Sequence, residues 1–182
     1  MKLKLIIYLC LFFIINNCTH SEVKVQSLPG KSRADFRSAR IYLTEGLNNY
    51  ALDSFLKVHE NAPCHVETLW IIGNIYYDST DDLNDIIEIF QNLKLAFDYY
   101  TLVLVNINKI SDWEVYTDHN RKYTFLHIKN DTEQQLESIY LKLYEIADSI
   151  YQDDVETAEF LFNELLKMYP EKTLPAWRLR LN

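Results

Sequence analysis

The chain has 182 residues, of which 48% are hydrophobic and 24% charged, and its 26 acidic and 18 basic side chains give a formal net charge of −8. That length is enough for one domain with a real hydrophobic core, and the negative charge argues against a general nucleic-acid binder, which needs a basic surface. The 3 glycines and 4 prolines leave little room for glycine-rich phosphate loops or a turn-dense β-sandwich. Long helices in a mainly α fold are therefore expected.

Residues 1–17 have the layout of an export signal. Met1 to Lys4 holds two lysines, and residues 5–15 are apolar throughout, as in a secretory signal peptide. The apolar run is shorter than the roughly 20 residues that a helix needs to span a bilayer. We therefore predict a signal peptide and not a stable transmembrane helix at this end of the chain.

A cysteine follows the apolar run in the segment Ile15-Asn16-Asn17-Cys18. This segment resembles the lipobox of bacterial lipoproteins, in which cysteine is the last residue. The resemblance implies that Cys18 becomes the lipid-modified amino terminus of the mature chain. Fatty-acyl chains such as palmitate would then hold the protein on a membrane of the cell envelope. An ordinary cleaved signal peptide and an uncleaved amino-terminal anchor are the alternatives.

The lipid prediction bears on the other cysteines. Cys10 lies inside the signal and would be lost on cleavage, which leaves Cys18 and Cys64. If Cys18 carries lipid, Cys64 is a lone thiol that acts as a small buried hydrophobe. If Cys18 is free, a Cys18–Cys64 disulfide can form in an oxidising compartment.

Residues 18–31 separate the signal from the rest of the chain. They are polar, lack sustained periodicity and contain Pro29-Gly30, which is typical of a linker. Fully extended, such a tether could reach about 40 Å at roughly 3.3 Å per residue. The folded domain is expected to occupy residues 32–182.

An internal echo suggests how this domain is built. Four residues between positions 51 and 63 have counterparts between positions 158 and 170, all at the same offset along the chain. In both sets the order is a small residue, an aromatic residue, an aliphatic residue and a proline. This order resembles the second helix of a tetratricopeptide (TPR) repeat, a helical hairpin of about 34 residues. The resemblance implies that the small residue lies at a close helix crossing and that the proline ends the helix. The recurring residues are Ala51, Phe55, Val58 and Pro63, then Ala158, Phe162, Leu165 and Pro170.

The resemblance divides the domain into antiparallel helical hairpins. The first would span residues 32–63, and the second would begin near Val66, where Leu69, Ile72, Gly73 and Tyr76 fit the first-helix pattern. Its second helix is expected over residues 83–97. A last hairpin would span residues 133–170. Some other α-helical arrangement is the alternative.

The middle of the chain, residues 100–129, lacks the repeat pattern. Thr101, Val103, Val105 and Ile107 place β-branched residues at every second position, which favours a strand. The segments 113–117 and 123–128 are separated by polar residues, as in a β-hairpin. A small β insertion over 100–129 is therefore predicted, with a further helix over 95–109 as the alternative.

The acidic segment "DSTDDLND", Asp78 to Asp85, is the strongest candidate for a metal site. A calcium-binding EF-hand loop needs glycine at its sixth position and glutamate at its twelfth, which here hold Leu83 and Ile89. A turn between helices with capping acids explains the segment better. Motifs of hydrolases, zinc proteases and phosphate-binding loops are absent from the sequence. No metal, cofactor or enzymatic activity is predicted.

Two functions fit these expectations. The first is a membrane-tethered protein–protein interaction module, which would bind an acidic or carboxy-terminal segment of another envelope protein. The second is a ligand-binding or regulatory lipoprotein whose site lies in the central β segment, around Trp113, Tyr116 and Phe125. The residues predicted to line the protein-binding face are Arg33, Phe36, Arg37 and Arg40 in the first hairpin and Trp70, Asn74 and Tyr77 in the second.

Overall fold

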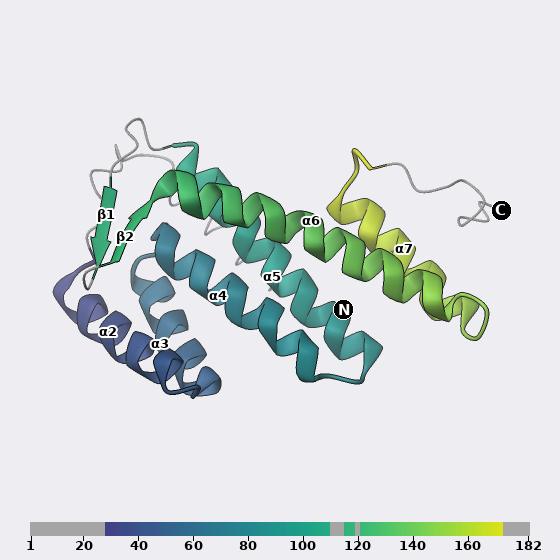
Figure 1. Ribbon diagram of the computed structural model, residues 1–182, viewed down its shortest axis with the longest axis horizontal. Helices are drawn as coiled ribbons and strands as arrows, with labels where there is room; N and C mark the ends of the chain where they lie inside the picture. Colours follow the sequence, from purple (N-terminus) through teal and green to yellow (C-terminus); the bar gives the residue numbers. More distant parts are fainter. Residues whose placement is uncertain (1–27, 110–114, 119–120, 173–182) are drawn as a thin grey trace.

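A computed structural model describes residues 28–109, 115–118 and 121–172, with side chains for 28–109 and 126–172. The expected mainly α fold is confirmed. Consecutive helices pair as antiparallel hairpins in chain order, and the long helix α6 runs along the α4–α5 hairpin with α7 folded back against it (Figure 1). The elements are α2 (Gly30–Thr44), α3 (Asn48–Asn61), α4 (Val66–Asp78), the 3-10 helix η1 (Ser79–Asp82), α5 (Ile86–Ile107), β1 (Val115–Asp118), β2 (Arg121–Thr124), α6 (Phe125–Ile150) and α7 (Val155–Met168).

Local sequence explains where α5 begins and how α2 turns into α3. The side chain of Asp85 accepts hydrogen bonds from the backbone amides of Ile87 and Glu88, at 2.8 and 3.0 Å, and so starts α5. An N-cap aspartate satisfies amides that have no partner within the helix. The acidic segment Asp78 to Asp85 is therefore a turn with a capping acid, as predicted. Between α2 and α3, Gly46 adopts a φ of 74°, a left-handed conformation that glycine tolerates best.

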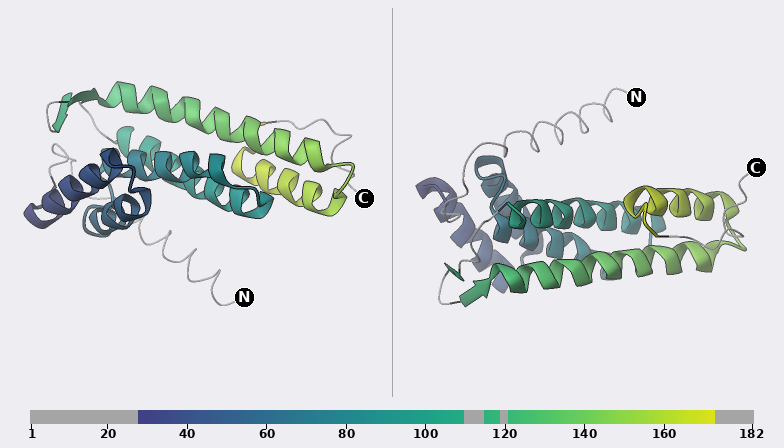
Figure 2. Two further views of the ribbon diagram at one scale, coloured as in Figure 1. Left: turned by 60° about the horizontal axis from the view of Figure 1, so that its bottom comes forward. Right: turned by 90° about the horizontal axis from the view of Figure 1, so that it is seen from above.

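The hydrophobic core lies between the hairpins in three connected clusters. One joins α2, α3 and α4, a second joins α5, α6 and α7, and the third lies where α4, the end of α5 and the start of α6 meet. Trp70 packs against all three clusters. Ala51 and Ala158, the small residues of the internal echo, are fully buried. Both views in Figure 2 show α6 alongside the α4–α5 pair over much of its length.

The middle of the chain differs from the prediction. Residues 100–107 are helical, because α5 continues to Ile107, and the strand expected there is wrong. Tyr100, Val103 and Ile107 are buried at helical spacing, whereas Val105 is 39% exposed. Packing against α4 and α6 thus overrides the β preference of the branched side chains.

The segment after α5 also departs from the expected β insertion over 100–129. The two short strands pair antiparallel, with Val115 opposite Thr124 and Asp118 opposite Arg121. The predicted strand over 123–128 is wrong beyond Thr124, because α6 begins at Phe125. This start is also well before residue 133, where the last hairpin was expected. Within the described ranges, none of the helices combines the length and the apolar character needed to cross a bilayer.

Candidate interaction surface

The residues predicted on α2 separate into buried and exposed side chains. Phe36 is only 1% exposed, and its ring packs edge-on against Phe55 at 5.4 Å and His65 at 5.5 Å. It therefore belongs to the core and cannot line an exposed face, contrary to the prediction. The physical reason is the register of α2: Ser32, Phe36 and Ala39 form its buried side.

Arg40 has a structural partner. Its Nη1 donates to Glu67 Oε1 at 2.7 Å, and the two side chains are only 16% and 2% exposed. The ion pair joins α2 to the first turn of α4. Removing one member of such a buried pair leaves an uncompensated charge, so Arg40 is better explained as a link between hairpins than as a free contact for a partner.

The other two arginines face solvent. Arg33 and Arg37 are exposed, and Ile41, one further turn along, is 56% exposed. Spacing by four places these three side chains on one face of the helix, here called the α2 stripe. Arg33 also donates from Nη2 to the carbonyl oxygen of Leu28 at 3.3 Å.

Two exposed apolar side chains of the amino-terminal hairpin, those of Tyr50 and Ile41, were not among the residues predicted from the sequence. Tyr50, in the first turn of α3, is 64% exposed, and its ring lies 5.9 Å from that of Tyr42 on α2. Ile41 was also missed, although it follows Arg37 by four residues. The four-residue spacing could have placed Ile41 on the same face as Arg37. It identifies that face as exposed only once the buried side of α2 is known.

The residues predicted on α4 lie toward α5 and α6. Trp70 Nε1 donates to Asp131 Oδ2 on α6 at 2.6 Å. Asn74 Oδ1 accepts from the hydroxyl of Tyr100 on α5 at 2.6 Å. These half-buried side chains are held in place by contacts within the protein.

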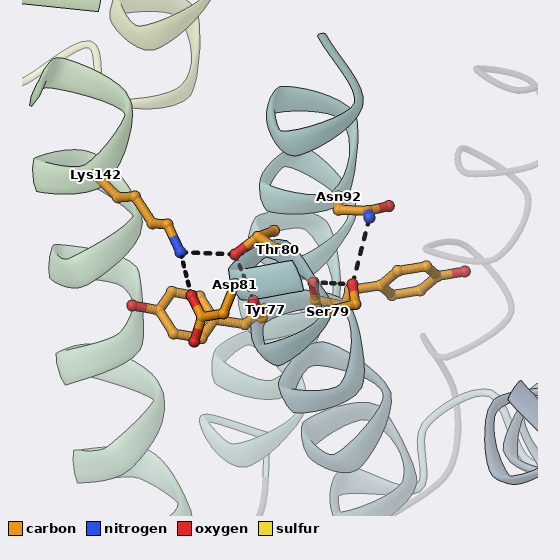
Figure 3. A network of polar contacts seen from close by, with 7 residues as sticks. Tyr77, Ser79, Thr80, Asp81, Asn92 and Lys142 are labelled. Carbon is orange, nitrogen blue, oxygen red and sulfur yellow. Dashed lines mark hydrogen bonds and ion pairs between the residues drawn. The ribbon is translucent and has the colours of Figure 1, made fainter. Parts of the chain in front are cut away.

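Tyr77, the third residue predicted on α4, also contacts α6, through Lys142. Lys142 Nζ lies 5.5 Å from the centre of the Tyr77 ring and donates to Thr80 Oγ1 at 2.8 Å and to Asp81 Oδ1 at 2.7 Å. Figure 3 shows Lys142 reaching from α6 toward Thr80 and Asp81 in the turn that follows α4. The lysine thus ties α6 to that turn.

The junction of α4, α5 and α6 is acidic. Burial raises the pKa of Asp78, and the nearby carboxylates of Asp81 and Asp131 raise it further, against the opposing effect of Lys142. Burial likewise raises the pKa of Tyr100, with smaller contributions from Asp131 and Asp78. The predicted face is therefore two chemically different places: a basic stripe on α2 and an acidic, internally bonded junction beside Trp70.

The remaining predicted site residues cannot be placed in the structure. Cys18 and Trp113 lie outside the described residues, and Tyr116 and Phe125 are described by their backbone alone. Cys64 is disulfide-bonded, which contradicts the lone thiol expected if Cys18 carries lipid. The other cysteines of the chain, Cys10 and Cys18, both precede the described residues. No group of three or more metal-ligating side chains that could hold an ion occurs in the described part of the chain.

No protein family, curated protein or solved structure matches this chain. The described residues form a mainly α fold of successive helical hairpins. This fold class is what the structure establishes. The exposed side chains that best combine charge and apolar area at the amino-terminal hairpin are those of the α2 stripe and Tyr50.

Proposed function

We propose that this protein is a membrane-tethered protein–protein interaction module of the cell envelope, built from TPR-like helical hairpins. The order of the helices supports this proposal, because α2–α3, α4–α5 and α6–α7 pair along the chain. Small residues at the crossings support it too. Ala51 and Ala158 are fully buried, and a Cβ atom on Gly73 would lie 2.7 Å from Tyr100 Cε1. Close approach of this kind is what the small positions of such hairpins provide.

The α2 stripe is the single observation that carries the binding role. Three of the 18 basic residues, Lys31, Arg33 and Arg37, are exposed on α2 of a chain whose formal net charge is −8, while Arg40 is held by Glu67. Arginine offers planar, bidentate donors that match carboxylates. Exposed Ile41, one turn beyond Arg37, and exposed Tyr50, whose ring contacts Tyr42 of α2, add apolar contact area. The proposed ligand is an acidic or carboxy-terminal segment of another envelope protein.

A photo-crosslinking residue at Ser38 tests this proposal in cells, because Ser38 is exposed between Arg37 and Ile41. The test variant is Arg33→Glu/Arg37→Glu, which leaves the Arg40–Glu67 pair intact. The control is Lys57→Glu/Lys109→Glu, which makes the same change of charge at two exposed positions elsewhere. We expect crosslinked partner bands in the wild type and the control and their loss in the test variant. Undiminished crosslinking in the test variant would refute the assignment.

A further inference from the structure

A buried histidine lies where the amino-terminal hairpin meets the next one. His59, in the last turn of α3, is 9% exposed, and its ring meets Tyr99 of α5 edge-on at 5.6 Å. Tyr99 in turn stacks on Tyr76 of α4 at 5.9 Å. The three rings therefore form a continuous contact from α3 through α5 to α4. This contact helps to seat the α2–α3 hairpin, which carries the α2 stripe.

One ring nitrogen of His59 lacks a hydrogen-bond partner among the described residues. That nitrogen is the buried Nδ1. A neutral imidazole tolerates this position with one unpaired acceptor, whereas an imidazolium has donors at both nitrogens and a charge to stabilise. Protonation would therefore place an unpaired N–H and a positive charge in a contact made of aromatic rings.

The surrounding groups do little to stabilise that charge. On α3 the nearby carboxylate is that of Glu60, which opposes the effect of burial but does not overcome it, so the pKa of His59 is lowered. The facing groups on α4 and α5 are the phenols of Tyr76 and Tyr99, and burial raises the pKa of Tyr99 to about 12. Both phenols are thus neutral around pH 7. Asp53 acts on Tyr76, and Asp98 acts on Tyr99.

We propose that His59 is a proton-sensitive latch, and that its protonation loosens the seating of the α2–α3 hairpin on α4 and α5. Well above the ordinary histidine pKa of 6.5, the imidazole is neutral in both the seated and the open hairpin, and the latch holds. As the pH falls below 6.5, the open form takes up the proton more readily, and seating is lost progressively down to the lower pKa of the seated form. The consequence for partner binding rests on the proposed function. The latch itself does not.

Hydrogen–deuterium exchange on the full chain tests the latch. Exchange is compared at pH 7.5 and pH 5.5 after correction for its intrinsic pH dependence. Opening of α2–α3 should become more frequent at the lower pH, by at most about tenfold, which is the ratio of protonated to neutral imidazole at pH 5.5 for the ordinary histidine pKa of 6.5. The amides of α6 and α7 should change less. His59→Phe keeps an aromatic ring beside Tyr99 but cannot be protonated, so it should lose this pH dependence. His127→Gln, a change at an exposed histidine on α6, should retain it.

Two results would overturn the latch. One is an α2–α3 hairpin whose corrected exchange is the same at both pH values. The other is a wild-type NMR titration in which the pKa of His59 is 6.5 or higher, a measurement that remains decisive if His59→Phe fails to fold. Neither measurement involves a binding partner, so failure of the latch and failure of the proposed binding role are distinguishable.

Discussion

The ring of Tyr100 lies so close to Gly73 that a Cβ atom on the glycine would come within 2.7 Å of Cε1 and 2.9 Å of Cδ1. Tyr100 is fully buried, and its hydroxyl donates to Asn74 Oδ1, the residue next to the glycine, at 2.6 Å. The hydrogen bond holds the ring against α4, and full burial of the side chain leaves it little room to move away. This contact sets how closely α4 and α5 pack.

Gly73→Ala should destabilise the protein. Overpacking a filled core costs about 1 to 3 kcal/mol, while replacing glycine with alanine inside a helix gains about 1 kcal/mol. We expect a net loss of about 1 kcal/mol in the free energy of unfolding measured with urea. Gly30→Ala is the matched control, since no atom outside its chain neighbours and the backbone of its own helix lies within 4 Å of a Cβ placed there. A Gly73→Ala variant more stable than the wild type would contradict the close packing.

Enlarging the buried alanines tests the other helix crossings. Ala51→Leu and Ala158→Leu each add a branched side chain where the present one is fully buried. Each should lower the free energy of unfolding by about 1 to 3 kcal/mol. Ala34→Leu makes the same change at an exposed position of α2 and should have little effect. Unchanged stability in both core variants would argue against TPR-like hairpin packing.

The hydrogen bond between Trp70 and Asp131 should couple α4 to α6. Bonds to a charged group contribute about 1.5 to 3 kcal/mol, and partial exposure of both residues favours the lower end of that range. A double-mutant cycle with Trp70→Phe and Asp131→Ala, followed by urea unfolding, measures the coupling directly. A coupling energy near zero would mean that the bond adds nothing to the packing of the two helices.

The start of α7 should respond to acid. Asp154 accepts hydrogen bonds from the hydroxyl and the backbone amide of Thr157, at 2.6 and 3.0 Å, and these bonds lower the pKa of its carboxyl group. Because the folded pKa is depressed, the stabilisation is present above the ordinary value of 3.8 and is lost as the pH falls through the folded pKa. Amide exchange in the first turn of α7, corrected for its intrinsic pH dependence, should rise in this range. Asp154→Asn, which cannot ionise, should remove the pH dependence, and an unchanged profile in that variant would refute the assignment.

Lipidation of Cys18 is tested by metabolic labelling with a fatty acid. We expect label in the wild type and in Cys64→Ala but not in Cys18→Ala. Non-reducing peptide mass spectrometry adds a second readout, because a lipid thioether on Cys18 excludes that residue as the disulfide partner of Cys64. Equal labelling of all three proteins, or a peptide that joins Cys18 to Cys64, would contradict the lipoprotein hypothesis.

Much of the helical architecture was predictable because its signals are local. Low glycine and proline content predicted a mainly α fold. The acids before α5 predicted a capped turn, and the hydrogen bonds of Asp85 bear this out. The first-helix pattern placed the start of the second hairpin near Val66, where α4 begins. A cap or a helix start depends on residues within one or two turns of each other, so the amino-acid sequence by itself contains the required information.

Tertiary contacts decided the remainder. The β-branched run Thr101 to Ile107 became helix because Val103 and Ile107 pack with Ile128, which lies on another helix. Phe36 turned inward while Arg37 stayed exposed, since the register of α2 follows from what α3 and α4 bury. Trp70 was engaged by Asp131, 61 positions away in the chain. Such pairings depend on which surfaces of distant helices meet. For this reason only the packed structure shows that, of the predicted binding face, Arg33 and Arg37 remain in the exposed α2 stripe.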